Sequence, residues 1–203
     1  MKRWYLINIF SIFLLLFMFS VSAYADQAER RDESFDFGAV KTVYVEPQVQ
    51  TAEGIVLPEI DSIKIDEMLT EDKRLLKHFT LTDDKSAADI TIAHELKAWG
   101  TQTYWQEPYT YIDYRTVSYI GSNGKRYYTS IPVTRYRPGY YYDVQYFSAK
   151  FTVTDNKSGK VIYERFDRRG DNKRAYAMFG RALRDFYRDF NSLCRDTAAA
   201  KEK

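Results

Sequence analysis

The chain has 203 residues and a formal net charge of +2 at pH 7, from 30 lysines and arginines against 28 acidic residues. This near balance excludes a general polyanion binder, which carries a large basic excess, so we expect no nucleic-acid partner. The length fits one domain that buries its core without disulfide or metal staples. Cys194 is the only cysteine, which excludes an internal disulfide. We expect it to pack as a small apolar residue, and pairing between two chains is the alternative.

The first residues have the pattern of an export signal. Lys2 and Arg3 precede an apolar run from Ile9 to Phe19, and Ala23-Tyr24-Ala25 then supplies small residues where a signal peptidase cleaves. We predict a signal peptide over residues 1–25, a mature chain that begins at Asp26 and no membrane span after cleavage. The alternative is a signal retained as an anchor. The predicted location is periplasmic or secreted.

The first part of the mature chain is predicted to hold a leader, a strand and a helix. Residues 26–34 are polar and charged, which is typical of a flexible leader. A half-buried strand interrupted near Gly38 follows, because apolar and polar residues alternate around Phe35, Phe37, Val43 and Val45. A helix is expected from about Asp61 to Lys77, since one helical face collects Ile65, Met68, Leu69, Leu76 and Phe79.

The middle of the chain is predicted to be extended and aromatic. A strand is expected where Ile90, Ile92, Leu96 and Ala98 alternate with more polar residues, with His94 on the apolar side. The segment from Tyr104 to Tyr146 then holds twelve of the 18 tyrosines, a composition that favours strands. Asn123-Gly124 is a hairpin signal, because both residues tolerate the positive φ of a tight primed turn. Tyr119-Ile120 should therefore pair roughly with residues 126–128.

A second hairpin and a long helix end the chain. Apolar residues alternate from Phe147 to Val153, Asp155 to Gly159 supplies turn residues, and Val161 begins the return strand. The last helix places apolar side chains at steps of three and four residues, namely Ala175, Met178, Phe179, Ala182, Phe186, Phe190 and Leu193. Residues 197–203 are predicted to be a disordered tail.

Together these elements predict an α+β fold. We expect a two-layer sandwich in which an antiparallel sheet carries two helices on one face and a Tyr-rich β-hairpin extension. A single domain is expected over residues 35–196, with the Tyr-rich insertion at about 104–146.

The order of these elements resembles an uncharacterised bacterial envelope family, domain of unknown function forty-one thirty-six. The matching pieces are Phe35-Asp36-Phe37-Gly38, Ala88-Asp89-Ile90-Thr91-Ile92, Phe151-Thr152-Val153-Thr154-Asp155 and the late hairpin residues Ser158 to Tyr163. The resemblance implies an envelope location and brings no catalytic residues. Many members of the family are lipoproteins, and this chain departs from them because it lacks a lipobox cysteine.

Few residues have the spacing of a catalytic or metal site. His78 and His94 are the only histidines, without the His-Glu-x-x-His spacing of a zinc site, so we expect no metal and no cofactor. The Gly-x-Ser-x-Gly motif of exported esterases is also missing. Glu107, Asp113 and Asp143 lie among the aromatic residues, and paired carboxylates are what a glycosidase needs. A carbohydrate-active hydrolase of the cell wall is therefore the alternative function.

The tyrosine cluster predicts a contact surface. Tyrosine presents a rigid ring and a hydroxyl at low entropic cost, and its mixture with arginine is typical of protein interfaces. The predicted binding residues, for protein or glycan, are Tyr104, Trp105, Tyr111, Arg115, Tyr127, Tyr128, Tyr136 and Tyr141. The alternative is that the rings pack across strands. We expect a non-enzymatic exported cell-envelope protein that acts as a binding or assembly module, with an envelope protein or a glycan as partner.

Overall fold

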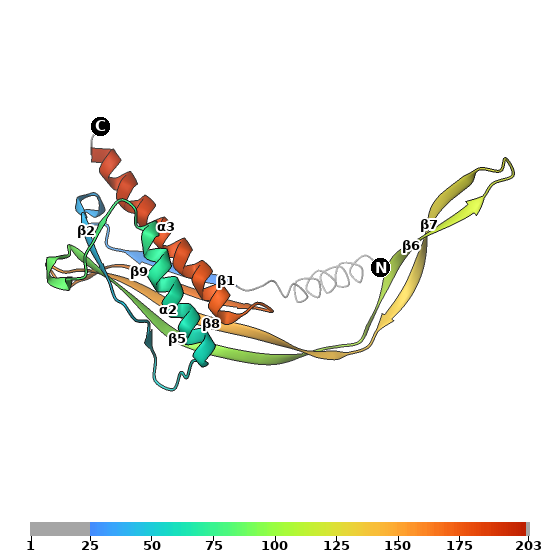
Figure 1. Ribbon diagram of the computed structural model, residues 1–203, viewed down its shortest axis with the longest axis horizontal. Coiled ribbons are helices and arrows are strands. Elements are labelled where there is room, and N and C mark those ends of the chain that lie inside the picture. The colour runs from blue at the N-terminus through green and yellow to red at the C-terminus, as the bar shows by residue number, and fades with distance from the viewer. Residues whose placement is uncertain (1–24, 202–203) are drawn as a thin grey trace, which may run out of the picture. The chain divides into compact units, whose positions relative to one another are not determined.

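The computed structural model describes residues 25–201 (Figure 1). Apart from Ala25, the predicted signal peptide lies outside this range. The chain divides into two compact units. We call Gln102–Val144 the arm, and the described residues on either side of it, 25–101 and 145–201, the body.

The body combines a mixed sheet with two helices, which is an α+β architecture. The strand order is β1-β9-β8-β5-β2-β4, with β3 also paired to β5. The strands are β1 (Ala25–Arg31), β2 (Thr42–Val45), β3 (Gln50–Thr51), β4 (Thr80–Leu81), β5 (Ile90–Gln106), β8 (Tyr140–Asp155) and β9 (Val161–Asp171). The helices are α2 (Glu59–Asp72) and α3 (Ala175–Lys201), and the 3-10 turns are η1 (Phe37–Ala39), η2 (Lys73–Leu75) and η3 (Lys85–Ala87).

The sheet is mixed, so the prediction of an antiparallel sheet was wrong. β9 pairs antiparallel with β1 and β8, whereas β2 runs parallel to both β4 and β5. Between β2 and β5 the chain passes through α2, and a helical crossover of this kind joins parallel strands. Alternation of apolar residues shows only that a strand is half-buried, and it carries no information on the direction of its neighbour.

Two segments predicted to be irregular are ordered in the structure. The expected leader forms β1, an edge strand that pairs with β9 from Ala25 opposite Arg169 to Arg31 opposite Tyr163. This pairing is made by the backbone, so the polar side chains of β1 gave no alternation to detect. The expected tail from residue 197 is the end of α3, which continues to Lys201.

The end of α3 is ordered because η1 packs against it. A Cβ atom on Gly38 would lie 2.8 Å from the backbone nitrogen of Ala198, so only glycine allows this approach. Lys201 also forms an ion pair with Asp36, the residue that caps η1. The predicted strand from Phe35 to Val45 is therefore divided into η1 and β2, and the interruption expected at Gly38 is the point of contact with α3.

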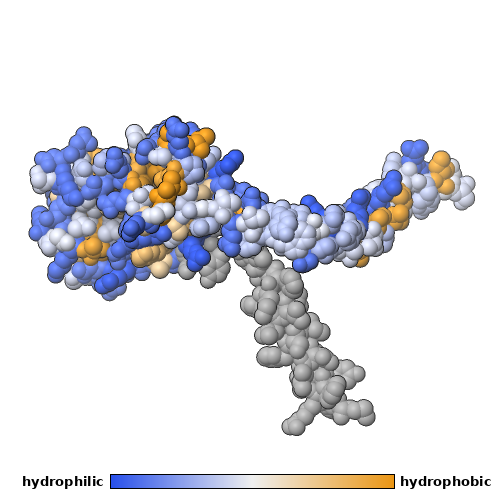
Figure 2. Space-filling view, turned by 90° about the horizontal axis from the view of Figure 1, so that it is seen from below, coloured by the Kyte–Doolittle hydropathy of each residue, from blue (hydrophilic) through white to orange (hydrophobic). Residues whose placement is uncertain are grey.

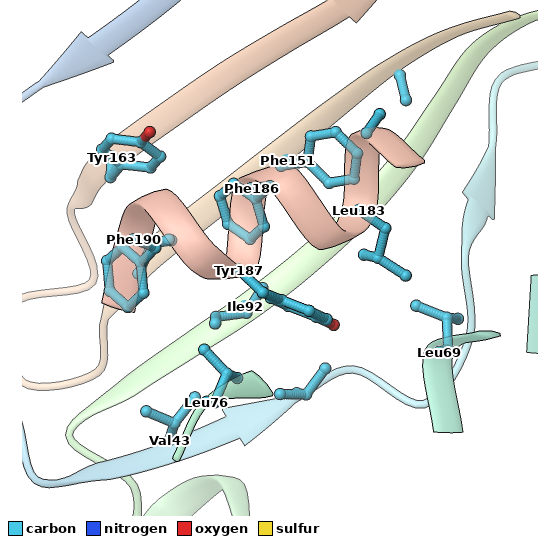
Figure 3. Close-up of a cluster of buried hydrophobic side chains, with 14 of the residues drawn as sticks. Val43, Leu69, Leu76, Ile92, Phe151, Tyr163, Leu183, Phe186, Tyr187 and Phe190 are labelled. Carbon is cyan, nitrogen blue, oxygen red and sulfur yellow. The ribbon is translucent and has the colours of Figure 1, made fainter. Parts of the chain in front are cut away.

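The core lies between α3 and the sheet, with α2 contributing to it (Figure 3). Phe186 of α3 stacks on Phe151 of β8 at 4.9 Å between ring centroids, and it also lies 5.9 Å from the ring of Tyr163 on β9. Ile65 and Leu69 bring α2 into the same cluster. The predicted apolar stripe of the last helix is confirmed, because all its members are buried except Leu193, which is partly buried.

Two groups of buried polar residues accompany this core. Asp167 of β9 is fully buried and accepts hydrogen bonds from Arg169 Nε at 2.7 Å and from Gln27 Nε2 at 3.1 Å. His94 of β5 is also fully buried, and its Nε2 atom lies 3.0 Å from the Tyr187 hydroxyl of α3. Within residues 25–201, neither helix is both long and apolar enough to cross a membrane.

Candidate functional site

The arm is built around a regular two-stranded ribbon. Its strands, β6 (Tyr109–Ile120) and β7 (Arg126–Arg137), pair antiparallel from Tyr109 opposite Arg137 to Ile120 opposite Arg126, with no shift in register. β-Branched and aromatic residues dominate both strands, which suits a pleated ribbon.

The turn between the strands differs from the predicted primed turn. Gly121 N–H donates to Lys125 O at 2.9 Å, and Gly124 N–H donates to Gly121 O at 2.9 Å, so the loop has three residues. Of these only Gly124 has a positive φ, 72°, and Asn123 does not. The Asn123 side chain instead holds the loop, because it accepts from Lys125 N–H and donates to the Tyr127 hydroxyl.

Paired residues of a ribbon point to the same face, so the register divides the arm into two surfaces. The odd-numbered residues form what we call the Arg-Tyr face, which holds Tyr109, Tyr111, Asp113, Arg115, Val117, Tyr119, Tyr127, Thr129, Ile131, Val133, Arg135 and Arg137. The even-numbered residues form what we call the Ile-Tyr face, which holds Thr110, Ile112, Tyr114, Thr116, Ser118, Ile120, Arg126, Tyr128, Ser130, Pro132, Thr134 and Tyr136.

Side chains of the Arg-Tyr face bind one another. Arg135 Nε lies 2.7 Å from Asp113 Oδ2, and the rings of Tyr119 and Tyr127 stack with centroids 5.5 Å apart. The Tyr109 hydroxyl accepts a hydrogen bond from Arg137 at 3.4 Å. The residues of β6 and β7 that are partly shielded from solvent, Asp113, Val117 and Val133, all lie on this face.

Every residue of the Ile-Tyr face is exposed. Ile112, Tyr114, Ile120, Tyr128 and Tyr136 have relative exposures of 62%, 69%, 68%, 69% and 67%. Within the described chain none of the three tyrosine rings has an aromatic neighbour or a hydrogen-bond partner for its hydroxyl. The ribbon is pale in Figure 2, as expected for tyrosine on this scale, and isolated orange residues interrupt it.

The remaining aromatic residues of the arm pair across β5 and β8. The rings of Tyr104 and Tyr142 stack at 5.8 Å, and Trp105 lies 4.7 Å from Tyr141. Tyr104 and Trp105 are less exposed, at 41% and 46%, than the tyrosines of the Ile-Tyr face, whereas Tyr141 is 73% exposed.

The eight predicted binding residues therefore do not form one surface. Tyr111, Arg115 and Tyr127 lie on the Arg-Tyr face, Tyr128 and Tyr136 on the opposite face, and Tyr104, Trp105 and Tyr141 near the β5–β8 pairs. Ile112, Tyr114 and Ile120 of the Ile-Tyr face were not among the predicted binding residues. Counting outward from the predicted two-residue turn would have paired odd-numbered with even-numbered residues, so the sequence carried no signal that finds this face.

The other candidate residues are bound or buried. Asp113 is held by Arg135, and Asp143 accepts a hydrogen bond from Thr103 at 2.7 Å. Burial lowers the pKa of His94 to about 3, with a smaller contribution from the charge of Lys73. Burial also raises the pKa of the Cys194 thiol to about 12, so it is a poor nucleophile. Across residues 25–201, no group of three or more His, Cys, Asp or Glu residues could hold a metal ion.

A shallow groove with charges of both signs lies beside the end of β1. It is lined by Arg30, Arg31, Asp32, Glu33 and the first residues of β9, from Val161 to Glu164. The mixture of charges selects neither an anion nor a cation.

Comparisons with known proteins give only slight similarities. No family model matches the chain, and no curated protein matches it. Several solved structures are similar to it in part. PelC from Paraburkholderia phytofirmans, described as a dodecamer, is 9% identical and has a TM-score of 0.42, over 83% of this chain and 98% of that one.

The second structure is a DUF4136 family protein from Bacteroides thetaiotaomicron, which is 12% identical with a TM-score of 0.43, over 87% of this chain and 98% of that one. The third is a PDZ domain protein from Parabacteroides distasonis, which is 15% identical with a TM-score of 0.28, over 87% of this chain and 38% of that one. The chain is thus similar in structure to a DUF4136 family protein. At these scores the similarity assigns neither membership of that family nor a function.

Proposed function

We propose that this protein is a non-enzymatic, exported cell-envelope protein that acts as a binding or assembly module through the hairpin of its arm. In this proposal the signal peptide directs the chain to the periplasm, the body is a two-layer sandwich, and the arm is a Tyr-rich extension that meets an envelope partner. The observation that carries the proposal is the Ile-Tyr face, which presents exposed isoleucine and tyrosine side chains without partners in residues 25–201.

A surface of this kind is more typical of a protein contact than of a face that stays in water. Large apolar side chains that are gathered on one exposed face mark interaction sites on soluble proteins. Tyrosine adds a hydroxyl that can bond a partner, and it loses little side-chain entropy when it is ordered. Arg126 lies on the same face beside Ile120, so the face also has a cation, and tyrosine with arginine is typical of interface hot spots.

The hydrolase alternative has less support. A glycosidase needs two carboxyl groups about 5–10 Å apart, of which one is held protonated. Asp113 instead forms an ion pair with Arg135 at 2.7 Å. Asp143 accepts a hydrogen bond from Thr103, and no contact in the described residues pairs it with Glu107 or Asp113, so the binding role is preferred.

The test compares the two faces of the arm in the native envelope. Replacing Tyr114, Tyr128 and Tyr136 with serine removes the rings of the Ile-Tyr face, and replacing Tyr111, Tyr119 and Tyr127 with serine is the matched control on the other face. All six positions lie outside the core cluster, so both variants should keep the thermal unfolding temperature of the body. We expect the first variant to lose its cross-linked partners and the second to keep them. Unchanged cross-links in both variants would refute the proposal.

A further inference from the structure

The ladder between β6 and β7 determines which backbone groups point away from the ribbon. Next to the turn, the bond from Gly121 N–H to Lys125 O marks a hydrogen-bonded pair. Hydrogen-bonded and non-hydrogen-bonded pairs alternate along an antiparallel ladder, and this ladder has no register shift. The odd-numbered pairs are therefore the bonded ones, and the even-numbered residues direct their N–H and C=O groups to the two outer edges.

Two independent observations agree with this assignment. Pro132, which has no N–H group, occupies an even-numbered position, where it removes no bond from the ladder. Tyr114, also even-numbered, donates its N–H to the Oδ1 atom of its neighbour Asp113 at 2.9 Å rather than to β7.

The two outer edges are not equivalent. Pro132 lies in the middle of β7 and interrupts its edge, which is a common way to prevent a further strand from pairing. The outward-facing positions of β6 all keep their N–H groups; they are Thr110, Ile112, Tyr114, Thr116, Ser118 and Ile120. Within residues 25–201, β6 pairs with β7 alone. An unblocked edge of this length is a template for strand addition.

The charges of β6 indicate what the added strand is. Asp113 and Arg115 flank Tyr114, and Arg115 has no ion-pair partner in the described residues. If a second β6 pairs antiparallel with Tyr114 opposite Tyr114, each Asp113 lies opposite the Arg115 of the other copy. A two-fold axis one residue earlier or later would place Asp113 opposite Asp113, or Arg115 opposite Arg115, and like charges directly opposite each other are destabilising.

We propose that two copies of this protein pair through their β6 edges, antiparallel about Tyr114, and form a four-stranded sheet in the order β7-β6-β6-β7. This inference rests on the proposed function, because it names a second copy as the partner of the arm. A lone two-stranded ribbon is only marginally stable in water, whereas three or more strands with an apolar face are stable. In the pair, Asp113 binds Arg115 of the second copy in place of the Tyr114 N–H group. That N–H group then donates a hydrogen bond to the opposite β6 strand.

Disulfide trapping in the full exported protein tests the register. Cα atoms of a hydrogen-bonded antiparallel pair are about 5.5 Å apart, within the range that a disulfide spans, so Tyr114→Cys should give a linked homodimer under mild oxidation. Tyr128→Cys on β7 is the matched control, because both residues are 69% exposed on the same face, and it should give no linked dimer. The wild type, in which Cys194 is buried, should also give no disulfide-linked dimer.

A second pair of variants keeps the register testable if Tyr114→Cys misfolds. In the proposed register Ile112 lies opposite Thr116, so a mixture of Ile112→Cys and Thr116→Cys proteins should form a linked heterodimer. Neither variant should link to itself, because the two identical positions would be about 14 Å apart along the strands. Linked homodimers of Thr116→Cys, or no heterodimer in the mixture, would overturn the register.

Charge reversal tests the ion pairs separately. Arg115→Asp, placed in the Tyr114→Cys protein, puts acidic residues opposite one another and should lower the yield of linked dimer by about tenfold or more. Mixing it with an Asp113→Arg version should restore a linked heterodimer, because opposite charges then face each other. A yield that does not change with charge would refute the pairing by Asp113 and Arg115.

The outcomes of these experiments distinguish a failure of the self-pairing from a failure of the proposed function. If Tyr114→Cys and the Ile112–Thr116 mixture give no linked dimer, while serine at Tyr114, Tyr128 and Tyr136 still abolishes envelope cross-links, self-pairing is wrong and the binding role stands. If the linked dimer forms while no envelope contact depends on these tyrosines, the self-pairing stands and the wider binding role fails.

Discussion

Phe186 provides the sharpest test of how this protein is held together. Its side chain is fully buried, and its ring lies between those of Phe151 at 4.9 Å, Tyr163 at 5.9 Å, Tyr187 at 5.6 Å and Phe190 at 6.2 Å. Truncating a buried phenylalanine to alanine costs about 3–5 kcal/mol from lost transfer energy and the cavity left behind. Because each aromatic pair adds roughly 0.5–1.5 kcal/mol, we expect Phe186→Ala to lower the free energy of unfolding by about 4–5 kcal/mol.

Urea unfolding followed by circular dichroism at the helical band measures this loss, since both helices belong to the body. Phe166→Ala is the control of identical chemistry. Phe166 is 41% exposed on β9, with Lys150 Nζ 5.5 Å from its ring centroid, so we expect a loss of about 1 kcal/mol. A loss below about 1 kcal/mol for Phe186→Ala, or equal losses for both variants, would show that α3 is not the centre of the core.

Three further predictions concern buried charge, pH and processing. Asp167→Ala leaves the Arg165 and Arg169 charges without their buried partner and should cost about 3–5 kcal/mol in urea unfolding, whereas Glu33→Ala at the exposed Arg31–Glu33 pair should cost under about 1 kcal/mol. The folded pKa of His94, about 3, lies below its unfolded value of 6.5, so its contribution to stability is complete above pH 6.5 and is lost as the pH falls. Between pH 6.5 and 5 the free energy of unfolding should fall by about 2 kcal/mol, and His94→Leu should abolish that slope. Sequencing the N-terminus of the exported protein should begin at Asp26, and recovery of an intact Met1 in the membrane fraction would contradict cleavage after Ala25.

Local periodicity in the sequence was sufficient to predict the helices and strands whose own side chains form the core. The phenylalanines of α3 recur at helical spacing, and the alternation from Phe147 to Val153 identifies β8, because burial of one face imposes a period on the sequence itself. The turn between β8 and β9 was located in the same way, from residues that favour tight turns between two alternating runs.

The tertiary structure alone decided the features that depend on a distant neighbour. β1 is held by backbone pairing to β9, the end of α3 is held by its contact with Gly38, and the parallel pairing of β2 with β5 follows from the crossover through α2. None of these leaves a local period, since backbone bonds and close approaches are made without a repeating apolar pattern.

The candidate site, too, was predictable from the sequence only in part. Composition alone located the aromatic segment, and Asn123-Gly124 located its turn. Which tyrosines share a face depends on the cross-strand register, and which edge of the ribbon is open depends on the hydrogen-bonding parity that places Pro132 on the outside of β7. A shift of one residue in that register would exchange the two faces, so only the paired strands could show that Ile112, Tyr114 and Tyr128 lie together.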